Sequence, residues 1–202
     1  MPTWNLFVYH LLNAASHPAP AAVTAMALLA NSPVIVVSAS LVLLWVRGAP
    51  AHRAGVLATA LAVLAALGVN QLLGLLWFEP RPFMVPVGHT LITHAADNSF
   101  PSDHATFIWS FAGGLIASRA APGWGRLAIL YGLAVAWARI WLGVHFPIDM
   151  LGAALVALPA AWFAHAITAP VRSLLLPPCE RLYEAALRAL CLPPALFPRR
   201  PI

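Results

Sequence analysis

Three short clusters of polar and ionisable residues interrupt an otherwise apolar chain. They lie at residues 79–83, where the sequence reads Glu-Pro-Arg-Pro-Phe, at residues 101–104, where it reads Pro-Ser-Asp-His, and between residues 139 and 149. The side chains in these clusters that could take part in chemistry are Arg81, Ser102, Asp103, His104, Arg139, His145 and Asp149. Because ionisable groups are costly in apolar surroundings, we interpret the clusters as parts of one functional site.

This set of residue types suits the transfer of a phosphoryl group. The guanidinium groups of Arg81 and Arg139 can bind phosphoryl oxygens through forked hydrogen bonds. Ser102 is a candidate helix N-cap, and the free N–H groups at a helix N-terminus bind phosphate. One histidine can attack phosphorus to form a phosphohistidine while another protonates the leaving group. Asp149 follows His145 by four residues and can hold that imidazole in one tautomer.

The composition indicates a membrane protein. Of 202 residues, 61% are hydrophobic and 8% are charged, whereas soluble domains carry roughly 25% charged residues. The mean hydropathy is +0.83. These values exclude a disordered chain, a nucleic-acid-binding domain with a broad basic face and almost any soluble enzyme. The histidines and acids lack the compact spacing of metal ligands, so we expect no metal site and no cofactor.

Five apolar stretches approach the ~20 residues that a transmembrane helix needs. They are 21–46, 54–78, 105–118 (with a start near Ser102), 127–142 and 146–168. The sequence Asn31-Ser32-Pro33 predicts a kink in the first. The stretch 4–15 either lies in the interface or enters the membrane. We therefore predict an all-α, polytopic bundle of about five to six transmembrane helices.

The chain is predicted to divide into a membrane-embedded domain, residues 1–170, and a cytoplasmic or interfacial tail, residues 171–202. Within the tail, residues 178–192 are typical of an amphipathic interfacial helix, with Glu180, Glu184 and Arg188 on one polar face.

The arginines predict an orientation in the membrane. Nine of the eleven flank the expected turns at one side or lie in the tail, whereas Arg81 and Arg139 lie at the other side with the three polar clusters. The positive-inside rule places the arginine-rich side in the cytoplasm. The candidate site is therefore expected to face the outside.

The three clusters resemble the motifs of the type-2 phosphatidic acid phosphatase superfamily of membrane lipid phosphatases. That family has a lysine, six residues and Arg-Pro, then Pro-Ser-Gly-His, then Ser-Arg followed by a histidine and an aspartate. This sequence has Arg-Pro at residues 81–82, Pro-Ser-Asp-His at 101–104 and Arg-Ile-Trp-Leu-Gly-Val-His-Phe-Pro-Ile-Asp at 139–149. The spacing of the third motif matches that of the family.

Three positions depart from the family pattern. Gly74 stands where the family has lysine, Asp103 where it has glycine, and Ala138 where it has serine, and the chain contains no lysine. With Ser99-Phe100 before it, the second motif resembles the bacitracin-resistance branch of undecaprenyl pyrophosphate phosphatases. The sequence leaves open whether Asp103 contacts Arg81 or Arg139, or helps to position His104.

The resemblance implies a metal-independent phosphatase in the inner membrane of a bacterium, acting on a lipid pyrophosphate or phosphate among membrane lipids. By the family pattern, His145 attacks the distal phosphorus, Asp149 orients it, and His104 protonates the leaving group. By the same pattern, Arg81, Arg139 and Ser102 hold the phosphoryl oxygens, and Asp103, which stands in place of the family's glycine, is expected to be a further substrate-binding residue.

Undecaprenyl pyrophosphate, released outside during wall synthesis, is the expected substrate, with its lipid chain between the spans. The same motifs fit phosphatidylglycerophosphate, phosphatidate or a lipid A phosphate, because they contact the phosphate and not the tail. A non-catalytic transporter or scaffold is an alternative from another class. Such a protein is expected to lack a catalytic histidine, and His104 and His145 are both present.

Overall fold

The computed structural model describes residues 1–192 and residue 197, and within these residues the secondary structure is entirely helical, as predicted. The elements are α1 (Thr3–Leu12), α2 (Pro20–Asn31), α3 (Pro33–Arg47), η1 (Pro50–His52), α4 (Arg53–Leu76), η2 (Pro82–Met84), α5 (Asp103–Ala117), α6 (Pro122–Trp141), α7 (Pro147–Pro170), η3 (Val171–Leu175) and α8 (Leu176–Ala189).

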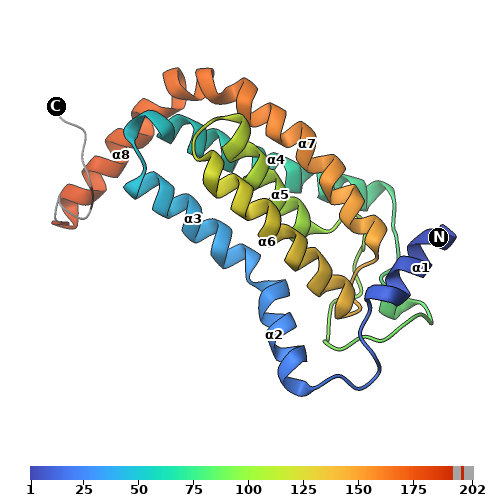
Figure 1. Ribbon diagram of the computed structural model, residues 1–202. Coiled ribbons are helices and arrows are strands. Elements are labelled where there is room, and N and C mark those ends of the chain that lie inside the picture. The colour runs from blue at the N-terminus through green and yellow to red at the C-terminus, as the bar shows by residue number, and fades with distance from the viewer. Residues whose placement is uncertain (193–196, 198–202) are drawn as a thin grey trace.

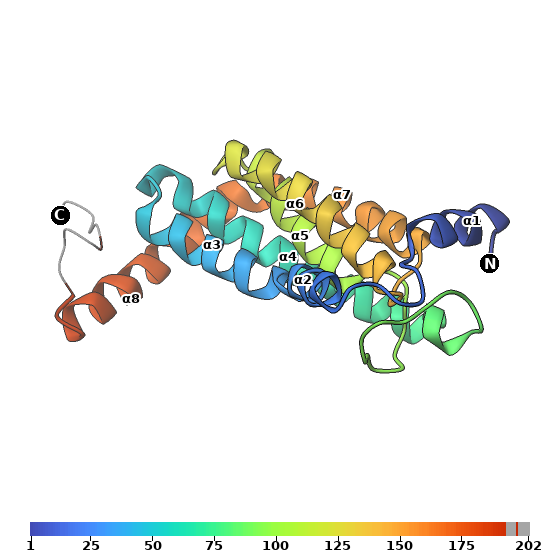
Figure 2. The ribbon, with the colours of Figure 1, turned by 60° about the horizontal axis from the view of Figure 1, so that its bottom comes forward.

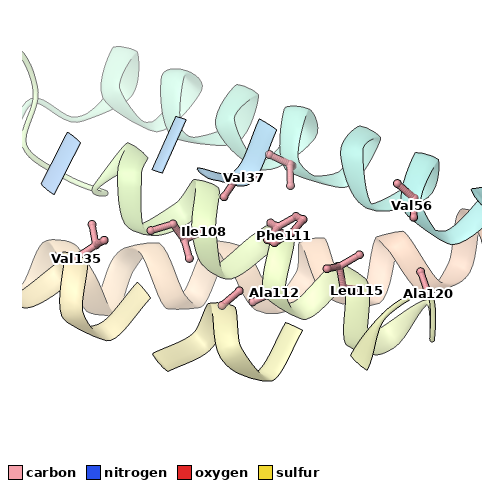
Figure 3. Packing of buried hydrophobic residues seen from close by; sticks show 10 residues of the cluster. Val37, Val56, Ile108, Phe111, Ala112, Leu115, Ala120 and Val135 are labelled. Carbon is pink, nitrogen blue, oxygen red and sulfur yellow. The ribbon is translucent and has the colours of Figure 1, made fainter. Parts of the chain in front are cut away.

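Helix α5 lies at the centre of the bundle. It packs against α4, α6 and α7 and, to a lesser extent, against α3 (Figure 1). Its side chains Ile108, Phe111 and Leu115 are buried in the main hydrophobic cluster, where Val56 of α4 and Val135 of α6 meet them (Figure 3). Helix α5 is thus surrounded by the other helices, and its two ends lie at opposite ends of the bundle.

The expected stretches correspond to observed helices. The first is divided at Ser32 into α2 and α3, which are bent by 45°, so the kink predicted from Pro33 is confirmed. Helix α5 has Ser102 as its N-cap residue, as the sequence indicated. Helix α6 begins at Pro122, five residues before the apolar stretch, because proline is favourable in the first turn of a helix.

Two of the described helices are long and apolar enough to cross a membrane. They are Arg53–Leu76 and the continuous helix Pro147–Ala189, and the bent pair α2 and α3 makes a third if it counts as one span. Helix α5 has 15 residues, which gives it a length of about 22 Å. The protein is therefore a helical membrane protein with two or three spans identified by length and composition.

The two ends of the bundle carry different elements. Helix α1 and the long connection between α4 and α5 lie at one end, and α8 lies at the other (Figure 2). Helix α7 continues through the π-helical turn η3 into α8, so the tail begins without a break in the helix. Beyond residue 192 the tail lies outside the described residues, apart from residue 197.

Glu180, expected on the polar face of the tail helix, is buried. Its side chain is 5% exposed, and Oε1 lies 3.5 Å from Nη1 of Arg53. The guanidinium of Arg53 also lies over the rings of Trp45 and Tyr183, at 5.5 and 5.3 Å from their centroids. Glu180 is buried because its partner comes from α4, 127 residues away in the chain.

Small residues allow α6 to approach α5 closely, and this predicts a contrast between two glycines of α6. A Cβ at Gly125 would lie 2.6 Å from the carbonyl oxygen of Ala112 and 2.6 Å from Cγ1 of Ile116, whereas a Cβ at Gly123 would meet nothing within 4 Å. Gly125→Ala should therefore destabilise the protein by about 1–3 kcal/mol through overpacking. Gly123→Ala should leave stability unchanged or raise it, because alanine favours helix.

Thermal unfolding of the two variants in the same detergent measures this difference. Equal melting temperatures for Gly125→Ala and Gly123→Ala would contradict the close packing of α6 on α5.

Candidate active site

The three polar clusters predicted to form one site meet at the end of the bundle near α1. The loop after α4 contributes Arg81, the start of α5 contributes Ser102 and His104, and the α6–α7 turn contributes His145. The backbone N–H of Ser102 donates to the carbonyl of Asp149, at 3.3 Å, which joins the second cluster to the third. Nη1 of Arg81 lies 3.0 Å from Nε2 of His145, which joins the first to the third.

His145 and Asp149 form a buried pair. Nδ1 of His145 lies 3.0 Å from Oδ2 of Asp149, and the two side chains are 2% and 0% exposed. Because an arginine has no hydrogen-bond acceptor, Nη1 of Arg81 must donate to Nε2, so the proton of the imidazole is on Nδ1. Burial, and then the charges of Arg139 and Arg81, hold the pKa of His145 well below its usual range. His145 is therefore neutral, with its lone pair on Nε2.

The local sequence explains why this pair forms. Phe146 is the N-cap residue of α7, Pro147 is in its first turn and Asp149 is the third helical residue. This places the Asp149 carboxylate where it accepts the Phe146 N–H, at 2.8 Å, and faces back toward His145. Ser99 donates to the same Oδ2 at 2.5 Å. Three donors from two segments thus stabilise one carboxylate oxygen.

Gly143 permits the turn that brings His145 into the site. Its φ is +77°, in the left-handed region that favours glycine. A Cβ there would also lie 2.0 Å from the carbonyl oxygen of His89, so the outer loop approaches the turn at this residue. A larger side chain at position 143 would separate the loop from the turn.

Arg81 is held by four groups. Its Nε donates to Oδ1 of Asp97 at 2.7 Å, Nη1 to the carbonyl of Val144 at 2.9 Å, and Nη2 to the carbonyl of Asn98 at 3.1 Å, in addition to the contact with His145. Arg81 is 6% exposed, whereas the side chain of Asp97 is 59% exposed. The guanidinium is thus fixed beside Nε2 of His145, with an exposed carboxylate as its ionic partner.

Arg139, at the last turn of α6, is 1% exposed. Its Nη2 lies 3.1 Å from Nε2 of His94, and its Nη1 donates weakly to the carbonyl of Ala30, at 3.4 Å. Because Arg139 must donate, Nε2 of His94 accepts, and Nδ1 donates to the carbonyl of Ala95, at 3.1 Å. Burial lowers the pKa of His94, and the charges of Arg81 and Arg139 lower it further. His94 is therefore a neutral acceptor for Arg139.

Three groups of the site that can donate a hydrogen bond have no partner among the described residues. They are the buried hydroxyl of Ser102, the buried Nε of Arg139 and the half-buried imidazole of His104. His104 lies close enough to Arg139, His94 and Arg81 to interact with them electrostatically. Buried polar groups normally have partners. An anion with several acceptor oxygens would supply them here.

Residues 55–172 match the PAP2 superfamily. The chain belongs to the PAP2 superfamily. The matched region includes all three polar clusters, so the resemblance found in the motifs is confirmed over most of the bundle.

Two relatives and one solved structure extend the PAP2 match. YbjG of Escherichia coli (strain K12) is 37% identical over 155 residues, which are 76% of this chain and 77% of YbjG. Undecaprenyl-diphosphatase BcrC of Bacillus subtilis (strain 168) is 33% identical over 154 residues, 76% of this chain and 79% of BcrC. The crystal structure of Aquifex aeolicus LpxE shares the fold, with a TM-score of 0.67 and 22% identity over 81% of this chain and 95% of LpxE.

The residue at the PAP2 glycine position, Asp103, faces α4. Its carboxylate accepts from Nδ2 of Asn70 at 2.8 Å and from Nε2 of Gln71 at 3.3 Å. Asn70 also donates to the hydroxyl of Thr106, at 3.0 Å, one turn further along α5. The sequence left open what the Asp103 side chain contacts. In the structure it contacts α4, and it thereby links the start of α5 to that helix.

Helix α1 and its C-cap residue contact the segments around the site through two asparagines, Asn5 and Asn13. The Asn13 side chain donates to the carbonyls of His89 and Trp141, at 2.9 and 3.1 Å, and accepts the N–H of His89 at 2.7 Å. Asn5 accepts the N–H of Ile148, at 2.9 Å, at the start of α7. The outer loop, the end of α6 and the start of α7 are therefore fixed to one short helix.

The sequence analysis named Ser99 as part of the second motif. It missed four other residues that contact the site. They are His94, Asp97, Asn70 and Asn98. For Asp97, the signal was its position on the outer side, which holds four of the six acids together with the three polar clusters. The other three carry no spacing that indicates a role, since their partners lie 17 to 45 residues away in the chain. No group of three or more potential metal ligands occurs among the described residues.

The ion pair between Arg81 and Asp97 predicts competition with phosphate. A phosphate that binds Arg81 must displace the Asp97 carboxylate, so Asp97→Asn should lower the inhibition constant of inorganic phosphate about two- to fivefold, the range for an exposed ion pair. The matched control is Glu79→Gln, because the Glu79 carboxylate accepts from Nε1 of Trp77. Unchanged inhibition in Asp97→Asn, or the same decrease in Glu79→Gln, would show that Asp97 does not compete.

Proposed function

We propose that this PAP2 protein is an integral membrane lipid phosphatase that removes the distal phosphate of undecaprenyl pyrophosphate through a phosphohistidine intermediate. The observation that carries the proposal is the tautomer of His145, whose Nδ1 proton is bound by Asp149 and whose Nε2 lone pair accepts from Arg81 and can attack once Arg81 turns to the phosphate. Arg81 and Arg139 lie beside it, with donors that can bind phosphoryl oxygens.

In the first step, Nε2 of His145 attacks the distal phosphorus, and the bond from that phosphorus to the bridging oxygen breaks. The imidazole gains positive charge as the N–P bond forms, and the Asp149 carboxylate stabilises this charge through Nδ1–H. Arg81 leaves Nε2 and donates to the phosphoryl oxygens, together with Nε of Arg139 and the hydroxyl of Ser102. These donors stabilise the charge that develops in the transition state.

His104 is proposed as the acid and base of the reaction. Its imidazole is half-buried beside Arg139 and has no partner among the described residues, so it can contact the leaving oxygen. It protonates the bridging oxygen as the lipid monophosphate departs. It then takes a proton from water, which attacks the phosphohistidine and releases inorganic phosphate while His145 returns to its neutral form.

The likeness to BcrC of Bacillus subtilis, which is named an undecaprenyl-diphosphatase, supports an undecaprenyl diphosphate substrate. An apolar groove of about 880 Å³ at the bend between α2 and α3 is a suitable place for the lipid chain, because residues of the loop that carries His94 also line it. Leu28, Leu91 and Ile92 line it, and the nearby Ala30 carbonyl accepts from Arg139. The same phosphate chemistry on phosphatidylglycerophosphate, phosphatidate or a lipid A phosphate is the alternative within this class.

A non-catalytic transporter or scaffold would not need a nucleophile in one defined tautomer. We therefore favour catalysis by residues 1–170, with residues 171–202 as the tail. We also propose that five helical segments cross the membrane, with α2 and α3 as one of them, and that the protein acts in the bacterial inner membrane.

Trapping of the phosphoenzyme tests the proposal. Purified protein with EDTA present is mixed with lipid pyrophosphate labelled in the distal phosphate, then denatured at alkaline pH, where phosphohistidine survives. The wild type should retain label, and His145→Ala should retain none and lose turnover by several powers of ten. His104→Ala should accumulate label from a substrate with a good leaving group, because water attack is slowed more than phosphorylation.

The histidine His165 provides a matched control, since it lies at the other end of the bundle. His165→Ala should retain the label and turnover of the wild type. Label in His145→Ala, turnover above about a tenth of wild type in that variant, or loss of activity with EDTA would contradict the mechanism.

Cysteine labelling in intact cells tests the orientation. In a background in which Cys179 and Cys191 are replaced by serine, Ala96→Cys in the outer loop should react with a membrane-impermeant thiol reagent. Gly123→Cys, at the exposed start of α6, should react after the cells are permeabilised and not before. The reverse pattern would place the active site in the cytoplasm.

A further inference from the structure

A second polar pocket lies at the end of the bundle away from His145. It has a volume of about 590 Å³ and lies between the α5–α6 turn and the end of α7. The polar residues that line this tail-end pocket are Ser118, Arg119, His165, Thr168, Arg172 and Ser173. The lining includes no aspartate or glutamate. Since α5 has 15 residues, the pocket is about 22 Å from the start of that helix and is separate from the active site.

Both arginines of the tail-end pocket lie in uncommon backbone conformations. Arg119 has φ +58°, in the left-handed region, and follows the C-cap residue of α5, a position where glycine is usual. Arg172 lies in the π-helical turn η3, a conformation found often at functional sites. Neither conformation is needed to place an arginine at a membrane surface, since long side chains reach the interface from ordinary helices.

The remaining polar groups of the pocket suit an anion. His165 donates from Nδ1 to the carbonyl of Ala117, at 3.1 Å, which leaves Nε2 as a second donor when the ring is protonated. The Ser118 hydroxyl is buried next to Gly55 of α4 and is not one of the donors. Two guanidinium groups and an imidazole around one opening form a donor set that binds phosphate.

We propose that the tail-end pocket binds a phosphate group, either in the head group of an anionic phospholipid or as free phosphate. The pocket is at the arginine-rich end of the bundle, where basic pockets between helices contact lipid head groups. Arg119 and Arg172 bind the phosphate oxygens from two sides, and the ligand links the α5–α6 turn to the junction of α7 and α8. This site is independent of the proposed phosphatase reaction.

Native mass spectrometry of the purified full-length protein tests the proposal. One arm titrates the protein with short-chain phosphatidylglycerol and with phosphatidylcholine, and a second arm titrates it with inorganic phosphate. Arg119→Gly and Arg172→Gln should each weaken binding of one phosphatidylglycerol about fivefold, and the double variant about thirtyfold, as expected for independent basic residues near an anionic head group. Phosphatidylcholine binding should be unchanged.

Two controls separate binding from folding and from general charge. Arg119→Gly removes a strained backbone position, so its melting temperature should equal or exceed that of the wild type while binding is lost. Arg126→Gln removes an exposed arginine that does not line the pocket, and it should bind as the wild type does.

Each outcome decides the proposal. Selective loss of phosphatidylglycerol in the pocket variants supports a lipid site, and selective loss of inorganic phosphate alone supports a site for free phosphate. An equal decrease in Arg126→Gln would show diffuse attraction to a basic surface and would overturn the site. So would unchanged binding of both probes in the double variant.

Discussion

The active site depends on one buried carboxylate oxygen, Oδ2 of Asp149. A buried carboxylate is costly unless it is hydrogen-bonded, and this oxygen receives three bonds, from Ser99, His145 and the Phe146 N–H. These donors come from the loop before α5 and from the turn before α7, so both segments must close on the start of α7. The tautomer of His145, and with it the position of the lone pair on Nε2, follows from that closure.

The positive charges of the site have partners before any substrate arrives. Arg81 is paired with the exposed Asp97 and Arg139 with His94, and both partners come from the loop between α4 and α5. A phosphate would replace an exposed carboxylate and a neutral imidazole with a stronger acceptor, so the arginines exchange partners and the released Asp97 carboxylate is exposed to solvent. Burial and the charges of the two arginines lower the pKa of His94 and so favour its neutral state. The loop therefore adds no positive charge next to Arg81 and Arg139.

The sequence predicted those parts of the molecule that depend on local order. Apolar length predicted the helices, Pro33 predicted the bend, and the spacing of four residues predicted that His145 meets Asp149. The features that the sequence did not predict depend on contacts between residues that are distant in the chain. Loop residues 83–101 have no periodicity that assigns His94 to Arg139 or Asp97 to Arg81, and the polar pattern of the tail placed Glu180 outside because Arg53, its partner, belongs to another helix.

The absence of a lysine at position 74 is connected with the way in which Arg81 is held. A Cβ at Gly74 would lie 3.2 Å from Nδ2 of Asn98, so the side chain of Asn98 lies close against α4 at this residue. From there Asn98 accepts the N–H of Glu79 at 2.6 Å and donates to the carbonyl of Phe100, while its own carbonyl accepts from Arg81. A lysine side chain would need this space. Asn98 occupies it and joins the segment of Arg81 to the segment that leads into Ser102. Glycine at position 74 thus costs the site the family's lysine cation, but it allows a contact that holds Arg81 in place.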